Sequence, residues 1–320
     1  MIINKLNEIQ MILTKLQIII HHGGFFVLTG RNFKTFHSFE IGKEFQKAPF
    51  CTYTKLKAAI IKHIEVITCN CPFLGRHCCW FFKIAATDCP IGIGEVVRRV
   101  IGKALLSVIQ NDTLEVTGCS QLCAGISSAC EAVVHTVRSV YESDDAEGVF
   151  LVDASDAFIS LNRGLALRNI LHLCPFLGRV LINFYRKESS LFIGSDTLLF
   201  KEGTTQGDTL AMGMYAVASF PLINDLLTVN EVKQIWYADD TTGMGSVSKL
   251  RQWWDRINDL GQYYCYNPNV VKSTLLVKSY HFVKACDLFG NTNVSVTCDG
   301  VNVFGCPLGS DDYVKRELDR

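Results

Sequence analysis

The chain has 320 residues, of which 48% are hydrophobic and 19% are charged, and its formal net charge at pH 7 is zero. This length and composition predict one large domain or two subdomains with a substantial core, and they exclude a largely disordered protein. Zero net charge also excludes a strongly basic protein, although a neutral chain can still present a local basic groove to nucleic acid.

The cysteine content and the N-terminal residues bear on the compartment. The 14 cysteines are scattered and no secretory signal is evident, which predicts reduced thiols in an intracellular protein, with nucleus and cytoplasm not distinguished. Residues 1–20 are rich in Ile and Leu, but Lys5, Glu8 and Lys15 interrupt them. We therefore expect an amphipathic helix there and no membrane partner.

Residues 1–80 are the least informative part of the chain and are treated as a divergent N-terminal segment. They contain one cluster of potential metal ligands, formed by Cys69, Cys71, His77, Cys78 and Cys79. Its spacing matches no repeated Cys-x2-Cys pair, so ordinary half-buried thiols are favoured over a zinc site.

Residues 89–108 predict a helix with an apolar face and a basic face. The apolar positions are Val97, Val100, Ile101, Ala104 and Val108. Arg99 and Lys103 lie one turn apart on another face, with Arg98 beside them. Two interpretations stay open: these cations contact a nucleic-acid template or a triphosphate, or they form an ordinary solvated face.

The next segments predict a helix followed by a buried strand. Ser128 and Glu131 have the spacing of a capping box before a helix that continues to about Tyr141. An acidic loop follows, and then the apolar run 149–152, which is typical of a strand buried on both faces. Asp153 comes at the end of this strand.

The middle of the chain alternates helices with a hairpin. Helices are predicted over 165–173 and 176–185, separated at Pro175, and a hairpin is predicted over 191–200. Gln206-Gly207-Asp208 is expected to open a long apolar helix that Pro221 kinks or ends.

Residues 235–242 predict a second hairpin, in which Asp239 and Asp240 occupy the tight turn. Adjacent carboxylates repel each other and lose hydration in a packed turn, and oxygen ligands of this kind suit Mg²⁺. The alternative is a solvated turn, where Asp is common because it forms local hydrogen bonds. The surrounding motifs favour the cation site.

Three further features follow this hairpin. An amphipathic helix over 250–260 places its tryptophans in the core. The segment 267–273 carries Lys272, for which a role in function is weighed against an ordinary solvent lysine. Residues 294–298 and 301–304 flank Asp299-Gly300, which predicts a further hairpin.

The order of three motifs resembles that of a known enzyme family. A strand ending in Asp153, then Gln206-Gly207-Asp208, then Tyr237-Ala-Asp239-Asp240, resembles the palm of reverse transcriptases, closest to those of non-long-terminal-repeat and group II-like retroelements. The resemblance covers roughly residues 85–310. Each motif alone is modest support, but three in order at plausible spacing are specific.

The resemblance implies an α+β fold with the right-hand palm of polymerases, an antiparallel sheet backed by helices. Residues 81–147 would be a fingers-like region, 148–310 the palm with its catalytic motifs, and 311–320 a short C-terminal tail. We therefore expect only partial fingers and a thumb that is largely missing. Residues 305–309 resemble the primer-grip region.

The resemblance also implies RNA-directed DNA synthesis, with an RNA template, a DNA primer and deoxynucleoside triphosphates as partners. Asp153, Asp239 and Asp240, with the carbonyl of Ala154, would hold two Mg²⁺ ions, with Mn²⁺ as the alternative cation. Lys272 would protonate the pyrophosphate leaving group.

The remaining site residues implied by the resemblance surround the nucleotide. Asp156, Gln206 and Gly207 would lie beside the incoming nucleotide, and Phe158 would stand under its sugar and exclude a 2′-hydroxyl. From the residues alone, an apolar Phe at that position more often belongs to a core. Two departures from the family pattern are Cys89, where relatives carry an arginine that meets the triphosphate, and Thr209, where relatives carry a proline.

Three other functions remain alternatives. The first is a nucleic-acid-binding remnant that keeps the fold but has lost catalysis through Cys89. The second is another palm enzyme, such as an RNA polymerase or a nucleotide cyclase, which Phe158 and the Tyr-Ala-Asp-Asp form disfavour. The third is an unrelated α+β protein with accidental motifs.

Overall fold

The computed structural model describes residues 60–62, 64–65, 96–193, 196–205, 207–264 and 266–320. The cysteine cluster at 69–79, Cys89 and Gln206 lie outside these residues. The helices and strands are α3 (Val96–Thr117), α4 (Ala129–Glu142), β1 (Gly148–Val152), α5 (Ala157–Ser160), α6 (Arg163–Leu173), α7 (Pro175–Tyr185), β2 (Ser189–Ile193), β3 (Asp196–Phe200), α8 (Ala211–Leu226), β4 (Lys233–Tyr237), β5 (Asp240–Gly245), α9 (Val247–Tyr264), β6 (Thr274–Val277), α10 (Phe282–Phe289), β7 (Ser295–Thr297), β8 (Gly300–Val303), β9 (Cys306–Gly309) and α11 (Asp311–Leu318).

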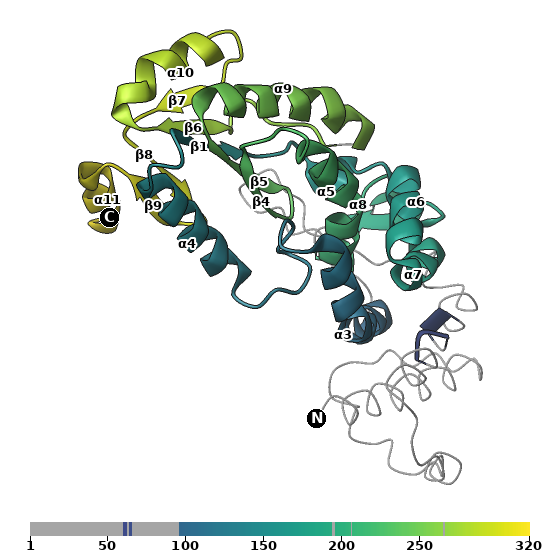
Figure 1. Cartoon of the computed structure of the whole chain (residues 1–320). Coiled ribbons are helices and arrows are strands. Elements are labelled where there is room, and N and C mark those ends of the chain that lie inside the picture. The colour runs from purple at the N-terminus through teal and green to yellow at the C-terminus, as the bar shows by residue number, and fades with distance from the viewer. Residues whose placement is uncertain (1–59, 63, 66–95, 194–195, 206, 265) are drawn as a thin grey trace, which may run out of the picture.

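A five-stranded sheet in the order β4-β5-β1-β6-β7 organises the fold (Figure 1). Strand β1 pairs antiparallel with both β5 and β6, and β4 pairs antiparallel with β5, while β7 runs parallel to β6. The mainly antiparallel sheet with helices on it agrees with the predicted palm, and β1 is its central strand.

Both faces of β1 are covered, because successive side chains of a strand point to opposite sides. Phe150 and Val152 belong to the main core, which includes α8 and α9, whereas Val149 belongs to a second cluster. That second cluster includes Val133 and Val137 of α4 and residues of the β8–β9 hairpin. Figure 1 shows α9 and α10 above the sheet and α4 below it. The predicted strand buried on both faces is confirmed.

The tryptophans of α9 are core residues, as their helical spacing predicted. Trp253 and Trp254 are 0% and 4% exposed, and the ring centroid of Phe150 lies 6.2 Å and 5.1 Å from theirs. Full burial of a large apolar side chain contributes about 1.5–3 kcal/mol, so these rings fix α9 firmly against β1.

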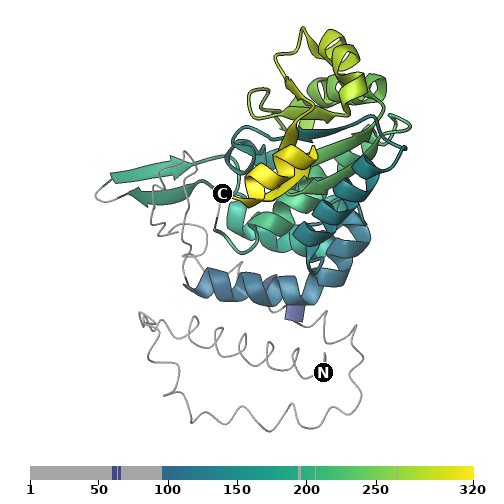
Figure 2. The ribbon, with the colours of Figure 1, turned by 90° about the vertical axis from the view of Figure 1, so that its left-hand side faces the viewer.

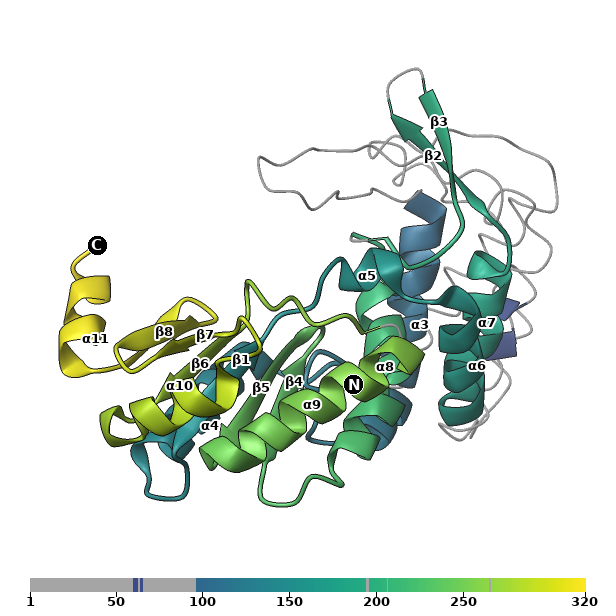
Figure 3. The ribbon, with the colours of Figure 1, turned by 90° about the horizontal axis from the view of Figure 1, so that it is seen from above.

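The hairpin of β2 and β3 projects from the body of the molecule (Figures 2 and 3). Its strands pair antiparallel from Ser189 with Phe200 to Ile193 with Asp196, which confirms the predicted hairpin. Helices α6 and α7 are also confirmed, and Pro175 is the first residue of α7, where the missing N–H of proline costs nothing.

The predicted hairpin across Asp299-Gly300 is wrong. Strand β7 pairs in parallel with β6, and β8 pairs instead with β9, so the turn of that hairpin lies at 304–305. The physical reason is that the two apolar runs are buried in different places. Val294 packs into the main core, whereas Val301 and Val303 pack into the second cluster with α4.

One predicted helix start and one predicted helix cap differ from the structure, although α4 itself spans Ala129–Glu142 as predicted. Helix α8 begins at Ala211 and continues through Pro221 to Leu226, because the residues after the proline are buried and their packing outweighs the lost hydrogen bond. Ser128 precedes α4 with φ +52° and its side chain makes no capping hydrogen bond, so the capping box does not form.

Within the described ranges, no helix is both long and apolar enough to cross a membrane.

Candidate active site

The sheet brings the predicted acidic residues to one edge. The last pair between β1 and β5 joins Val152 to Thr241, so Asp153 lies one residue further along, across from Asp240. Residues directly opposite each other in antiparallel strands have their Cβ atoms about 5 Å apart and point to the same face. Strands β4 and β5 close at the pair of Tyr237 and Asp240, which leaves Ala238 and Asp239 as the two-residue turn. The predicted placement of Asp240 in the turn is wrong, because its backbone pairs with Tyr237 as the first residue of β5.

The negative charges of the three carboxylates shift the pKa values of Asp239 and Asp240. Loss of hydration, followed by the charges of Asp239 and Asp153, raises the pKa of Asp240 to about 6 even though its side chain reaches solvent. Loss of hydration and the Asp153 charge raise the pKa of Asp239 as well, against a lowering by its own backbone N–H and by Lys272. Concentrated negative charge of this kind favours binding of a cation.

The segment 267–273 lies against the end of β1. Ser155 donates its backbone N–H to the Asn267 carbonyl at 2.8 Å, and Asn269 donates to the Asp153 carbonyl at 2.7 Å. These bonds place Lys272 over the acids, with its Nζ 3.5 Å from Oδ2 of Asp153. Lys272 is therefore brought to the carboxylates from a distant part of the sequence, although both partners of this ion pair remain partly exposed.

The donor chemistry at this edge suits a hard divalent cation, because carboxylate oxygens are the ligands that Mg²⁺ prefers. The carboxylates of Asp153, Asp239 and Asp240 do not, however, converge on one point. Among the residues that the structure describes, no group of three or more His, Cys, Asp or Glu side chains is close enough to hold a metal ion. Asp153, the turn residue Asp239 and the first residue of β5, Asp240, thus lie at the same end of their strands, where the charges of Asp153 and Asp239 raise the pKa of Asp240.

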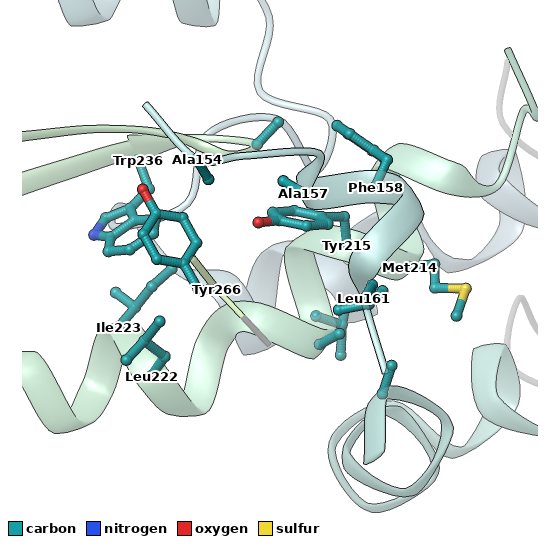
Figure 4. Close-up of a cluster of buried hydrophobic side chains, with 14 of the residues drawn as sticks. Ala154, Ala157, Phe158, Leu161, Met214, Tyr215, Leu222, Ile223, Trp236 and Tyr266 are labelled. Carbon is teal, nitrogen blue, oxygen red and sulfur yellow. The ribbon is translucent and has the colours of Figure 1, made fainter. Parts of the chain in front are cut away.

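Aromatic side chains form part of the buried cluster that includes Ala154 and Ala238, the neighbours of Asp153 and Asp239 (Figure 4). Phe158 is 7% exposed and its ring centroid lies 4.8 Å from that of Tyr215, while Tyr266 packs on Trp236 at 5.1 Å. Burial, reinforced by the nearby Asp239 charge, raises the pKa of both tyrosines, so they remain neutral. Phe158 is thus a core residue, as its apolar character alone suggested, and its role as a sugar gate stays a prediction.

Asp156 and Gly207, which were assigned to the nucleotide, and Ala154, which was assigned to the cation, come from two separate parts of the chain. Asp156 is exposed with φ +49° at the start of α5, and Ala154 before it is 6% exposed. Gly207 has φ +99°, a conformation that glycine adopts without strain. Their contacts with a nucleotide stay predictions, as does the role of the Ala154 carbonyl.

The expected basic face needs one correction. Arg98 is 1% exposed, and its guanidinium bonds Oδ2 of Asp208 through Nε at 3.0 Å and Nη2 at 2.5 Å. Arg98 also lies over the rings of Phe184 and Tyr185. It is therefore a core residue that cannot touch nucleic acid from this position. Arg99 and Lys103 are exposed and keep the predicted basic face.

Two contacts to the acidic turn were not anticipated from the sequence. Tyr266 donates its hydroxyl to the Asp239 carbonyl at 3.0 Å, and the buried side chain of Gln121 bonds both backbone groups of Ala238. No motif marks Gln121, because its partner lies 117 residues away and the contact depends on the tertiary fold.

Comparisons with known proteins yield matches to solved structures alone. The sequence matches no protein-family model, and a search of curated proteins gives no match. The fold is similar to that of telomerase from Candida albicans in complex with a fragment of telomeric RNA, with a TM-score of 0.51 and 9% identity over 76% of this chain and 46% of that one. It is also similar to apo telomerase from Candida tropicalis, with a TM-score of 0.52 and 10% identity over 72% and 47% of the two chains.

A third match is the Candida tropicalis telomerase truncated from its C-terminal domain, with a TM-score of 0.50 and 10% identity over 72% of this chain and 53% of that one. The chain thus spans about half the length of the solved structures that it matches. At such low identity the likeness concerns the fold alone. The chain shares its fold with part of these telomerase structures.

Proposed function

We propose that this chain is an RNA-directed DNA polymerase domain that extends a primer 3′-hydroxyl by nucleotidyl transfer, as in a retroelement. The observation that carries the proposal is that Asp153 at the end of β1 lies beside Asp239 in the β4–β5 turn and Asp240 at the start of β5, with Nζ of Lys272 3.5 Å from Oδ2 of Asp153. The likeness of fold to telomerase, including a structure that holds telomeric RNA, supports a polymerase and an RNA partner.

Each candidate site residue has a separate proposed role in this reaction. Asp153, Asp239 and Asp240 would hold Mg²⁺, with the Ala154 carbonyl as a further oxygen donor, and the bound cation would lower the pKa of the primer hydroxyl and neutralise phosphate charge. Lys272 would hold and release a proton at its Nζ beside the leaving pyrophosphate. The exposed Arg99 and Lys103 would attract the template or triphosphate.

The test is primer extension on an RNA template with deoxynucleotides and Mg²⁺. We expect Asp153→Asn and Asp239→Asn to reduce extension below detection, because each removes a charge that would hold the cation. Asp145→Asn is the matched control, since this exposed carboxylate pairs with Lys233 at the opposite end of β4. Full extension by both acid variants, or none by the unmodified protein, would contradict the proposal.

A second candidate is a nucleic-acid-binding remnant without catalysis. It is favoured by Cys89 in place of an arginine and by the open arrangement of the described carboxylates. This candidate predicts that the unmodified protein binds an RNA–DNA primer-template in a gel-shift assay while extending no primer. The polymerase proposal requires both binding and extension, so the two assays together separate the candidates.

A further inference from the structure

The turn that carries the acids contains an unfavourable backbone conformation. Ala238 has φ +56°, in the left-handed region that residues with a Cβ seldom adopt. The turn also carries Asp239 and leads directly into Asp240, whose carboxylates repel each other and Asp153. A strained turn with repelling side chains keeps one conformation only where its surroundings enforce it.

Gln121 supplies such enforcement from a remote part of the chain. Its Nε2 donates to the Ala238 carbonyl at 2.9 Å, and its Oε1 accepts the Ala238 N–H at 2.8 Å. One side-chain amide therefore bonds both backbone groups of the strained residue. Gln121 is 0% exposed, so water does not compete for these bonds.

Backbone hydrogen bonds on both sides of Gln121 hold its main chain in one position beside β4. Residues 120–122 lie along the outer edge of β4, where Leu122 donates to the Trp236 carbonyl at 2.8 Å and Trp236 donates to the Ser120 carbonyl at 2.9 Å. These bonds hold Gln121 alongside Trp236, two residues before Ala238. Nε2 of Gln121 also donates to Oγ of Ser219 in α8 at 3.4 Å, which further orients the Gln121 amide.

The backbone N–H and C=O groups of Ala238 and Asp239 therefore each have a polar partner. Gln121 bonds both groups of Ala238, Tyr266 donates to the Asp239 carbonyl at 3.0 Å, and the Asp239 N–H faces its own carboxylate. Buried backbone groups without partners are costly, so a turn that left this arrangement would lose several bonds together.

We propose that Gln121 is a positioning residue that clamps the Ala238 peptide groups and thereby fixes where Asp239 and Asp240 point. The inference rests on the proposed function for its catalytic consequence, but the clamp itself is a property of the folded chain. Gln121 would touch neither substrate nor cation and would act through the backbone of the turn alone.

The test replaces Gln121 by Met, which keeps length and volume but removes both hydrogen bonds. The matched control is Gln234→Met. Gln234 lies on the same hairpin, donates to the Ile223 carbonyl and accepts from the indoles of Trp236 and Trp253, all away from the turn. Gln121→Asn is a second variant, whose amide is one methylene too short to reach both groups at once.

Three readouts are used on the full chain. Hydrogen–deuterium exchange of the backbone amides at 237–240 reports the clamp directly, and we expect Gln121→Met to speed it on the order of tenfold. Binding of Mn²⁺ alone, followed by electron paramagnetic resonance, should weaken by a similar factor. Primer extension should lose kcat with little change in KM for the deoxynucleotide, because the clamp orients acids rather than substrate. Gln121→Asn should fall between Met and the unmodified protein.

The outcomes are decisive in both directions. Unchanged amide exchange at 237–240 in Gln121→Met would overturn the clamp, and so would an equal acceleration in Gln234→Met, because that would reflect general weakening of the hairpin. If the unmodified protein neither binds Mn²⁺ nor extends a primer, the proposed function fails. Faster exchange confined to the Gln121 variants would still support the clamp in that case.

Discussion

Arg98 and Asp208 lie 110 residues apart in the sequence and form an ion pair in which both side chains are 1% exposed. Asp208 also accepts from the Tyr185 hydroxyl at 2.5 Å and from the Leu210 N–H at 3.0 Å. Burial raises the pKa of Asp208, but the Arg98 charge and these hydrogen bonds outweigh it and leave the pKa lowered. The pair links α3 to the segment that immediately precedes α8.

The first prediction concerns this pair. Removing one partner of a buried ion pair leaves an uncompensated charge, which costs about 3–5 kcal/mol. We therefore expect Arg98→Met to lower the free energy of unfolding in urea by about this amount. Arg99→Met, on the exposed side of the same helix, is the control and should change it by less than about 0.5 kcal/mol. Equal effects of the two variants would contradict a structural role that is specific to Arg98.

The second prediction concerns pH. Asp240 has a folded pKa of about 6 against an ordinary value of 3.8, so the folded state binds its proton more tightly than the unfolded state does. Its contribution to stability is therefore favourable at low pH and is lost as the pH rises from 3.8 to about 6. Asp240→Asn should melt at the same temperature as the unmodified protein near pH 4 and at a higher temperature at pH 7.

The measurement is the melting temperature as a function of pH in the absence of divalent cations. Asp312→Asn, an exposed position in α11, provides the control and should follow the unmodified protein throughout. If the proposed cation site is real, saturating Mg²⁺ should raise the melting temperature of the unmodified protein more than that of Asp240→Asn at pH 7. A lower melting temperature of Asp240→Asn at pH 7 would contradict the predicted sign.

The third prediction separates two roles of Phe158. Because its ring is buried against Tyr215, Phe158→Ala should cost about 3–5 kcal/mol through the cavity that it leaves. If the ring also excludes a 2′-hydroxyl, this variant should incorporate ribonucleotides that the unmodified protein rejects. Phe289→Ala removes another buried ring, which packs on Phe150 at 5.4 Å, and should lose stability without a change in sugar selectivity. Unaltered selectivity in Phe158→Ala would limit this residue to packing.

The fourth prediction concerns Lys272. Its ion pair with Asp153 is partly exposed, so Lys272→Met should change stability by less than about 1 kcal/mol. As a proton donor to the leaving pyrophosphate, the same lysine should contribute about 10²–10⁴-fold to the rate of nucleotide addition. Lys284→Met, which removes a similar surface pair with Glu147, is the control for primer extension. Equal rates for the two variants would remove Lys272 from the mechanism.

The sequence determined much of the local structure by itself. The apolar run before Asp153 predicted the central strand, and the paired acids predicted the hairpin, because side-chain periodicity and turn chemistry act over a few residues. Asp239 lies in the turn as predicted, whereas Asp240 is the first residue of β5. The spacing of Trp253 and Trp254 likewise predicted their burial. The order of the motifs likewise predicted an α+β palm, in agreement with the mainly antiparallel sheet and its covering helices.

Only the tertiary structure decided the pairings between distant residues. It moved Arg98 from the expected basic surface into the core, because Asp208 offers a buried countercharge that periodicity cannot reveal. It paired β8 with β9 rather than β7, because the two apolar runs are buried in separate clusters. It also brought Gln121 to Ala238. Local sequence specifies which residues can form an element, whereas the partner of a remote side chain depends on how all the elements pack together.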